Sequence, residues 1–163
     1  QKDYKVHKDA VLEMQKEKYN ILRSATPEQL IYNDSLKAIK ELHEKLQDIY
    51  LSIKQSVTDS KTSITDTLIT KILMGVYGCV PAYDRYVKYT LKEYNIGHPS
   101  FCSSRLKELN EFYLEWKSVI DDENQKINSN GIKYPTMKIL DILFWQIGFD
   151  DDIEGSLKTS NEV

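Results

Sequence analysis

Breaks in the backbone are rare in this chain, and this constrains its fold more than any other feature. The 163 residues include only six glycines and four prolines, and long stretches contain neither. Sheets need frequent tight turns, which glycine and proline usually supply, whereas long helices do not. No segment alternates apolar and polar residues as a half-buried strand would. We therefore predict an all-α fold of about six helices, in which a long N-terminal helical hairpin packs on a compact C-terminal helical bundle.

The hairpin is predicted over residues 1–55 from the spacing of apolar side chains. Residues 4–22 have apolar side chains at roughly helical spacing, and Thr26-Pro27-Glu28 is typical of the start of a second helix. We expect an apolar stripe on this second helix to pack against the first helix or to form an interface with a second copy. His43 on the stripe is interpreted as a packing residue, or alternatively as a pH-sensitive contact. The stripe recurs at alternating steps of three and four residues, the heptad pattern: Leu36, Ile39, His43, Leu46, Tyr50 and Ile53.

The remainder of the chain begins with a Ser/Thr-rich segment, residues 56–65, which we expect to be a loop. A compact helical domain should follow over residues 66–148, and its last helix is apolar nearly all round, which is typical of a buried central helix. Residues 149–163 contain three consecutive aspartates and are predicted to be an acidic flexible tail. The helices of this domain are predicted over 66–77, from Pro81 to Tyr94, from Ser103 or Ser104 to before Asn130, and from Pro135 to Gly148.

Charge, hydropathy and cysteine content narrow the class of protein. The formal net charge is −3, which disfavours a wholly basic nucleic-acid binder but allows a local basic patch. No apolar run approaches the roughly 18 residues that a membrane span needs, so we expect no membrane association. Two cysteines cannot build a disulfide framework for a chain of this length. We therefore predict free thiols and a cytoplasmic location.

The segment with the most distinctive chemistry is residues 71–92, where a glycine-rich turn separates two predicted helices. Glycine lets a partner approach the backbone closely, and peptide N–H groups at a helix start attract anions. Basic side chains interleaved with aromatic ones are what a nucleic-acid contact requires. The alternative is that the tyrosines are core residues and the charges pair on the surface. The candidates for nucleic-acid or anion binding are Lys71, Gly75, Gly78, Tyr83, Arg85, Lys88 and Lys92.

Within this segment, residues 72–92 resemble the helical half of helix-hairpin-helix DNA glycosylases. The resemblance rests on the glycine turn and on the Val-Pro pair and aspartate that follow it, here Val80, Pro81 and Asp84. It implies a hairpin that contacts DNA phosphates and assigns Asp84 the role of catalytic acid/base if the chain is an enzyme. The hairpin's usual Gly-hydrophobic-Gly is replaced by Gly75-Val76-Tyr77-Gly78, so we interpret the resemblance as one of architecture.

Three further side chains could take part in metal binding or nucleophilic catalysis. Cys79, His98 and Cys102 include a His-x-x-x-Cys spacing, but no fourth zinc ligand lies near them in sequence. Cys79 is near a predicted helix start, which favours a reactive thiol, with His98 as the nearest base. Buried free cysteines are common, and we predict no metal and no cofactor. Asp141 interrupts the apolar last helix, and we expect it to pair with Lys138 or, bridging two segments, with Arg85.

These observations favour a non-enzymatic helical module that acts through contacts with a protein partner or as a homo-oligomer. Regulation, defence and toxin neutralisation are typical roles of small helical proteins of this kind. The alternative is a nucleic-acid-binding domain that uses residues 71–92, followed by a glycosylase-like enzyme. The sequence has no Walker loop, nucleophile elbow or dinucleotide fingerprint, so it dictates no reaction.

Overall fold

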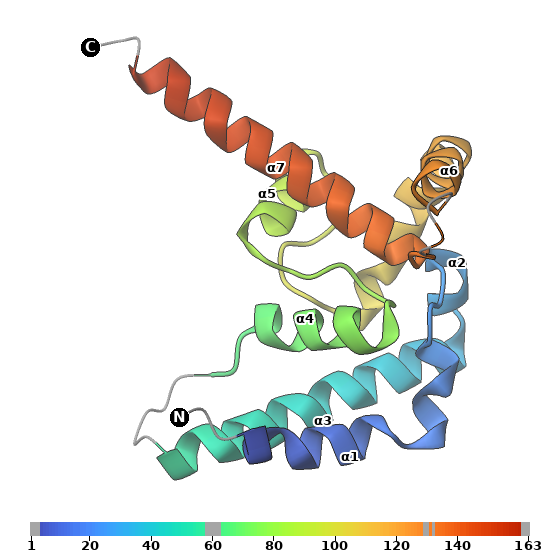
Figure 1. The fold of residues 1–163 in the computed structure, drawn as a ribbon, viewed down its shortest axis with the longest axis vertical. Helices are drawn as coiled ribbons and strands as arrows, with labels where there is room; N and C mark the ends of the chain where they lie inside the picture. The colour runs from blue at the N-terminus through green and yellow to red at the C-terminus, as the bar shows by residue number, and fades with distance from the viewer. Residues whose placement is uncertain (1–3, 58–62, 129–130, 132, 161–163) are drawn as a thin grey trace.

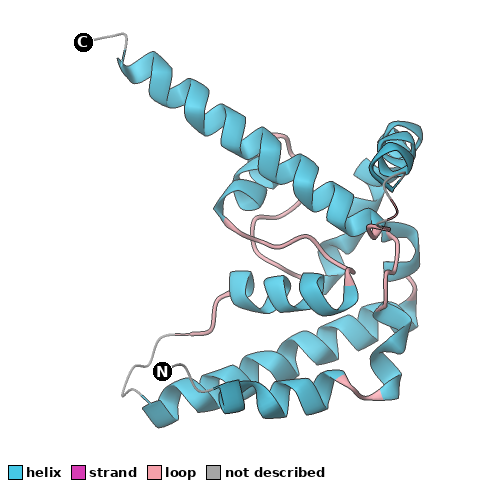
Figure 2. Ribbon diagram, viewed as in Figure 1, coloured by secondary structure: helices cyan, strands magenta, loops and turns pink. Residues whose placement is uncertain are grey.

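The computed structural model describes residues 4–57, 63–128, 131 and 133–160, and this part of the chain is all-α, as predicted (Figure 2). It contains no strand and has six α-helices of seven or more residues. Across the described residues, no helix combines the length and apolar character that crossing a membrane requires. Buried apolar side chains from Ala10 to Phe144 form one cluster, so the segments before and after residues 56–65 share a core.

The N-terminal segment folds back along α3 (Asn33–Val57), but it is not the continuous helix that we predicted. It consists of η1 (Tyr4–His7), α1 (Lys8–Met14) and η2 (Glu17–Leu22), and α1 lies beside α3 (Figure 1). The predicted helix start at Thr26 is real, because Thr26 and Gln29 form a capping box. It opens only the single turn α2 (Pro27–Leu30), however, and α3 begins separately at Asn33.

The heptad stripe of α3 is part of the chain's own core. Ile39, His43, Leu46 and Tyr50 are buried, and Leu36 and Ile53 are half-buried against the same cluster. Contacts from α1, η2 and α4 (Asp66–Tyr77) cover α3, so this face is not available to a second copy. Each fully buried leucine or isoleucine on it stabilises the fold by about 1.5–3 kcal/mol.

The helix α4 has the predicted bounds. Thr65 caps its start, and Gly78 ends it in the left-handed conformation with φ +62°. The next helix does not begin at Pro81 as predicted. Residues 78–84 cross the molecule without helix, and α5 (Arg85–Glu93) begins after Asp84, whose Oδ1 accepts hydrogen bonds from the N–H groups of Tyr86 and Val87 at 3.1 Å.

The C-terminal half of the fold is built on two long helices. After η3 (Ser103–Arg105), α6 (Leu106–Asn128) packs on α2 and α7, and α7 (Thr136–Ser160) crosses α5 and projects beyond the body (Figure 1). We predicted a helix end at Gly148 and a flexible tail from residue 149. Both predictions are wrong, because α7 continues as a helix to Ser160. Gly148 lies where α7 touches α5: a Cβ there would be 2.6 Å from the carbonyl oxygen of Tyr86.

Candidate functional site

A groove between α4 and the first turns of α7 collects several of the residues singled out in the sequence. It has a volume of about 720 Å³, and residues 78–84 run along it. Its lining combines charged side chains with exposed apolar ones, since Val76 and Ile142 are each 42% exposed and Trp145 is 37% exposed. The residues that line it include Lys71, Met74, Gly75, Val76, Gly78, Asp84, Tyr134, Pro135, Lys138, Asp141, Ile142 and Trp145.

The exposed side of α7 corrects a prediction. Its sequence is apolar nearly all round, which predicted a helix buried on every side. The helix instead buries one side, including Leu140 and Phe144, and presents Ile142 and Trp145 to the groove. The ring of Trp145 stacks on Phe149, with centroids 5.0 Å apart, and contacts Tyr86 edge-on. An aromatic surface therefore continues from the groove along α7.

The carboxylate of Asp141 connects α7 to the backbone of residues 78–84 at the floor of the groove. Its Oδ1 accepts a hydrogen bond from the backbone N–H of Ala82 at 2.8 Å, and its Oδ2 accepts one from Lys138 Nζ at 2.6 Å. Asp141 is buried, so this acceptor satisfies an N–H group that water does not reach. The predicted pair with Lys138 is confirmed, whereas the predicted bridge to Arg85 is wrong. Arg85 instead contacts Asp152 at 3.1 Å on the outer face of α7.

The two glycines of the turn have different environments. A Cβ on Gly75 would meet nothing within 4 Å, so the last turns of α4 present bare backbone to the groove. A Cβ on Gly78 would be 2.5 Å from the ring of Pro135, and its positive φ disfavours other residues. Gly78 is therefore needed to end α4 and to admit Pro135. Gly75 leaves space that the fold does not use.

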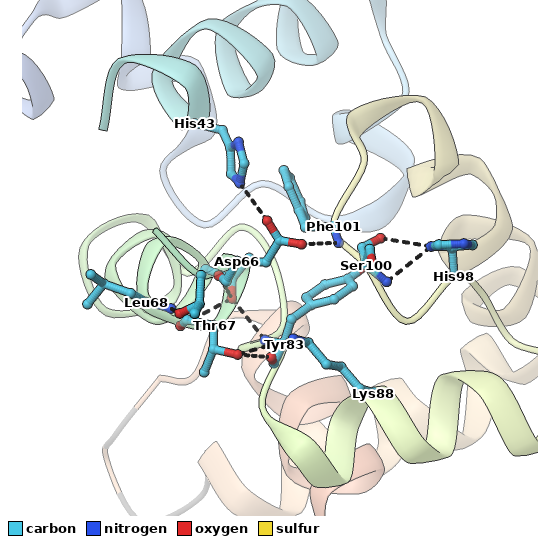
Figure 3. Close-up of polar contacts among 11 residues, drawn as sticks. His43, Asp66, Thr67, Leu68, Tyr83, Lys88, His98, Ser100 and Phe101 are labelled. Carbon is cyan, nitrogen blue, oxygen red and sulfur yellow. Dashed lines mark hydrogen bonds and ion pairs between the residues drawn. The ribbon is translucent and has the colours of Figure 1, made fainter. Parts of the chain in front are cut away.

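The basic and aromatic candidates of residues 71–92 do not gather on one surface. Lys71 lies on the groove, but Tyr83 is buried against Phe101, with ring centroids 5.6 Å apart. Lys88 Nζ donates to Thr67 Oγ1 at 3.3 Å, one helical turn before Lys71 on α4 (Figure 3). Lys92 Nζ is 3.5 Å from a carboxylate oxygen of its neighbour Glu93. Because Tyr83 is buried and Lys92 pairs with its neighbour, these candidates do not all lie on one exposed surface.

Asp66, at the start of α4, is the centre of a second polar cluster, drawn in Figure 3. Its Oδ2 accepts the N–H of Phe101 at 3.2 Å, and its Oδ1 is 3.7 Å from Nε2 of His43. That nitrogen is buried and has no hydrogen-bond partner in the structure. Burial lowers the pKa of His43, and the nearby carboxylate of Asp66 only partly opposes this. His43 is therefore a packing residue against Phe101, with ring centroids 4.7 Å apart.

The cysteines and His98 serve no common site. Cys79 is fully buried, and this burial raises the pKa of its thiol to about 12, so it is protonated at neutral pH. Cys102 is exposed, and its contact with the Ser104 hydroxyl at 2.9 Å lowers the pKa of its thiol. His98 Nδ1 accepts the N–H of Ser100 within its own turn. Among the residues that the structure describes, no three metal-ligating side chains of this kind gather.

Comparisons of the chain with protein-family models, with curated proteins and with solved structures found no match.

Proposed function

We propose that the chain is a non-enzymatic helical binding module whose protein partner inserts apolar side chains into the groove between α4 and α7. The observation that carries this proposal is the exposure of Val76, Ile142 and Trp145 around a concave surface. Burying large apolar side chains is the main source of affinity in protein contacts, and aromatic residues are enriched at the centres of such interfaces. The partner's surface would bury the apolar side chains that this chain leaves exposed in the groove.

The roles of the groove carboxylates also support binding over catalysis. Asp84, the candidate acid/base, holds two backbone N–H groups at the start of α5. Asp141 holds a third N–H group together with an ammonium group. Both side chains therefore stabilise the fold through hydrogen bonds to the backbone. A general acid or base must instead reach the reacting proton, and its pKa must suit the task.

Nucleic acid remains the alternative ligand that the test must separate from protein. Lys71 and Lys138 lie on the groove, but Lys138 is paired with Asp141. Arg85 and Lys88, which the alternative requires, contact Asp152 and Thr67. Nucleic acid would have to displace those contacts, which would reduce the binding free energy gained from each phosphate. This favours the protein partner.

The test is photo-cross-linking in cells that naturally express the chain. A benzophenone amino acid replaces Ile142 on the groove, and a matched control replaces Ser52, which is exposed on α3. We expect a discrete protein adduct from position 142 and none from position 52. Adducts with nucleic acid, or identical protein adducts from both positions, would overturn the proposal. Adding nuclease before analysis distinguishes the two kinds of adduct.

A further inference from the structure

A second groove, between α6 and α7, lies on the other side of α7. It has a volume of about 960 Å³ and is closed at one end by the turn at residues 94–98. Its apolar lining comes from Phe112 and Trp116 on α6 and from Leu143 and Ile147 on α7. Trp116 is 48% exposed, so much of this floor faces solvent. We call this groove the acidic trough because of the residues along its rim.

The rim on α6 carries three carboxylates, at Glu108, Glu111 and Glu115. Glu108 pairs with Arg105 at 2.8 Å. Glu111 and Glu115 are exposed, and neither has an ion-pair partner among the described residues. Positions 111 and 115 are one helical turn apart, so their side chains follow the same edge of the trough.

The α7 side of the trough continues the negative charge. Asp150 and Glu154 follow Leu143 and Ile147 along α7 at helical spacing. The lining groups that can carry positive charge are Arg105, already paired, and His98. The trough thus joins an apolar floor to an excess of carboxylates.

We propose that the acidic trough docks a basic amphipathic helix from a partner protein. Such a helix places apolar side chains at steps of three and four residues on one face, which suits a floor built by two helices. Its lysines or arginines would flank that face and meet Glu111 and Glu115. The rim from Glu108 to Trp116 spans about 12 Å at the helical rise, which is slightly more than two turns of a docked helix.

Charge disfavours a second copy of this chain as the occupant of the acidic trough. If two copies joined trough to trough by a two-fold axis, each rim would face an identical rim. Glu111 and Glu115 would then lie opposite carboxylates, and like charges in an interface oppose association. A basic helix avoids this repulsion. This second surface does not depend on the groove between α4 and α7, so each proposal can fail alone.

The test uses a fluorescein-labelled 14-residue helix of leucine and lysine with an amphipathic pattern, measured by fluorescence anisotropy with the full chain. The variant Glu111→Lys/Glu115→Lys reverses the rim. The matched control Glu44→Lys/Asp48→Lys makes the same charge change, at the same spacing, on the exposed face of α3. We expect the rim variant to weaken binding at least about tenfold and the control to weaken it less than about twofold.

Two further measurements keep the proposal open to refutation. Trp116→Ala, at an exposed position, should also weaken binding at least about tenfold by removing the floor's largest apolar contact. A peptide of the same composition with a scrambled pattern should bind at least about tenfold more weakly. Equal losses in the rim and control variants, or equal binding of both peptides, would overturn the proposal. So would a dimer, detected by light scattering, that Trp116→Ala dissociates, because the occupant would then be a second copy.

Discussion

Two sides of the helix α7 differ: a closed side, which packs on α5, and an open side, which faces the groove with α4. One glycine lies at each of these contacts. On the closed side, Gly148 lets α7 touch α5, and Thr90 Oγ1 donates to the carbonyl oxygen of Phe144 at 2.7 Å. On the open side, Gly75 of α4 faces a groove of about 720 Å³. Both glycines lie inside helices, where glycine usually costs stability. Gly148 offsets that cost through close packing, whereas Gly75 has no packing reason within the fold.

The difference between Gly148 and Gly75 distinguishes residues that the fold needs for packing from residues that form an open surface. Where two backbones are in contact, no ligand can enter, and substitution should damage the protein itself. Where a helix presents backbone and apolar side chains to open space, substitution should leave the fold intact and change only what binds there. The same type of change on the two sides therefore distinguishes structure from function.

The largest effect is expected at Asp141, whose buried carboxylate holds the backbone of Ala82 against α7. The substitution Asp141→Ala leaves a buried N–H group without an acceptor and removes the partner of Lys138. We expect a loss of about 3 kcal/mol in the free energy of unfolding, measured by urea denaturation. The substitution Asp141→Asn keeps an oxygen for Ala82 and should cost only about 1 kcal/mol. Equal losses would mean that the N–H contact contributes little.

A smaller loss is expected on the closed side. The substitution Gly148→Ala places a Cβ 2.6 Å from the carbonyl oxygen of Tyr86 and 3.0 Å from Thr90 Oγ1. Because the nearest atom belongs to the backbone, α5 and α7 must move apart. We expect destabilisation of about 2 kcal/mol by thermal and urea denaturation. No loss would show that the two helices are not in close contact.

A gain in stability, and not a loss, is expected on the open side. The substitution Gly75→Ala adds a Cβ that meets nothing within 4 Å and removes a flexible residue from the interior of α4. We expect an increase of about 0.5–1 kcal/mol in the free energy of unfolding. Measured in parallel with Gly148→Ala, it gives a direct comparison of the two sides. A loss of stability in both variants would show that Gly75, like Gly148, is required by packing.

The smallest effect is expected at His43 of α3, which lies beside Asp66 at the start of α4. Burial lowers the pKa of this imidazole below its ordinary 6.5, so the folded state binds the proton less readily than the unfolded state. Stability from this group is therefore complete above that pH and falls as the pH drops through 6.5 towards the folded pKa. We expect His43→Leu to reduce the loss of unfolding free energy between about pH 8 and about pH 5. An unchanged pH dependence would contradict this role.

The sequence predicted elements with strong local signals and missed those decided by distant contacts. The bounds of α4 follow from Thr65 and Gly78, and the structure has both. The sequence predicts a helix start at Pro81, whereas the structure begins α5 after Asp84. Asp84 prevails because the preceding backbone is held elsewhere: Tyr83 donates to Thr70 Oγ1 and Ala82 to Asp141. Neither partner is adjacent in sequence, so local patterns could not choose between them.

Only part of the lining of the candidate groove can be predicted from the sequence. The sequence points to Lys71, Gly75 and Gly78 and to the pair Lys138 and Asp141, but it predicts that the apolar residues of α7 facing them are core residues. A helix that is apolar all round gives no periodicity from which to tell its buried side from its exposed side. Gly148 was interpreted as a stop because a glycine signals the end of a helix unless a neighbouring helix needs the space. That need becomes visible only when α5 is in place.

If the groove beside Gly75 is a surface for a partner and not a part of the core, then filling it should block the partner and leave the fold intact. The substitution Gly75→Trp fills the groove from its open side, and the benzophenone probe at position 142 reports on the partner. We expect the filled variant to unfold at a denaturant concentration no lower than the parent chain and to lose the protein adduct. A stable filled variant that still forms the same adduct at position 142 would contradict the claim.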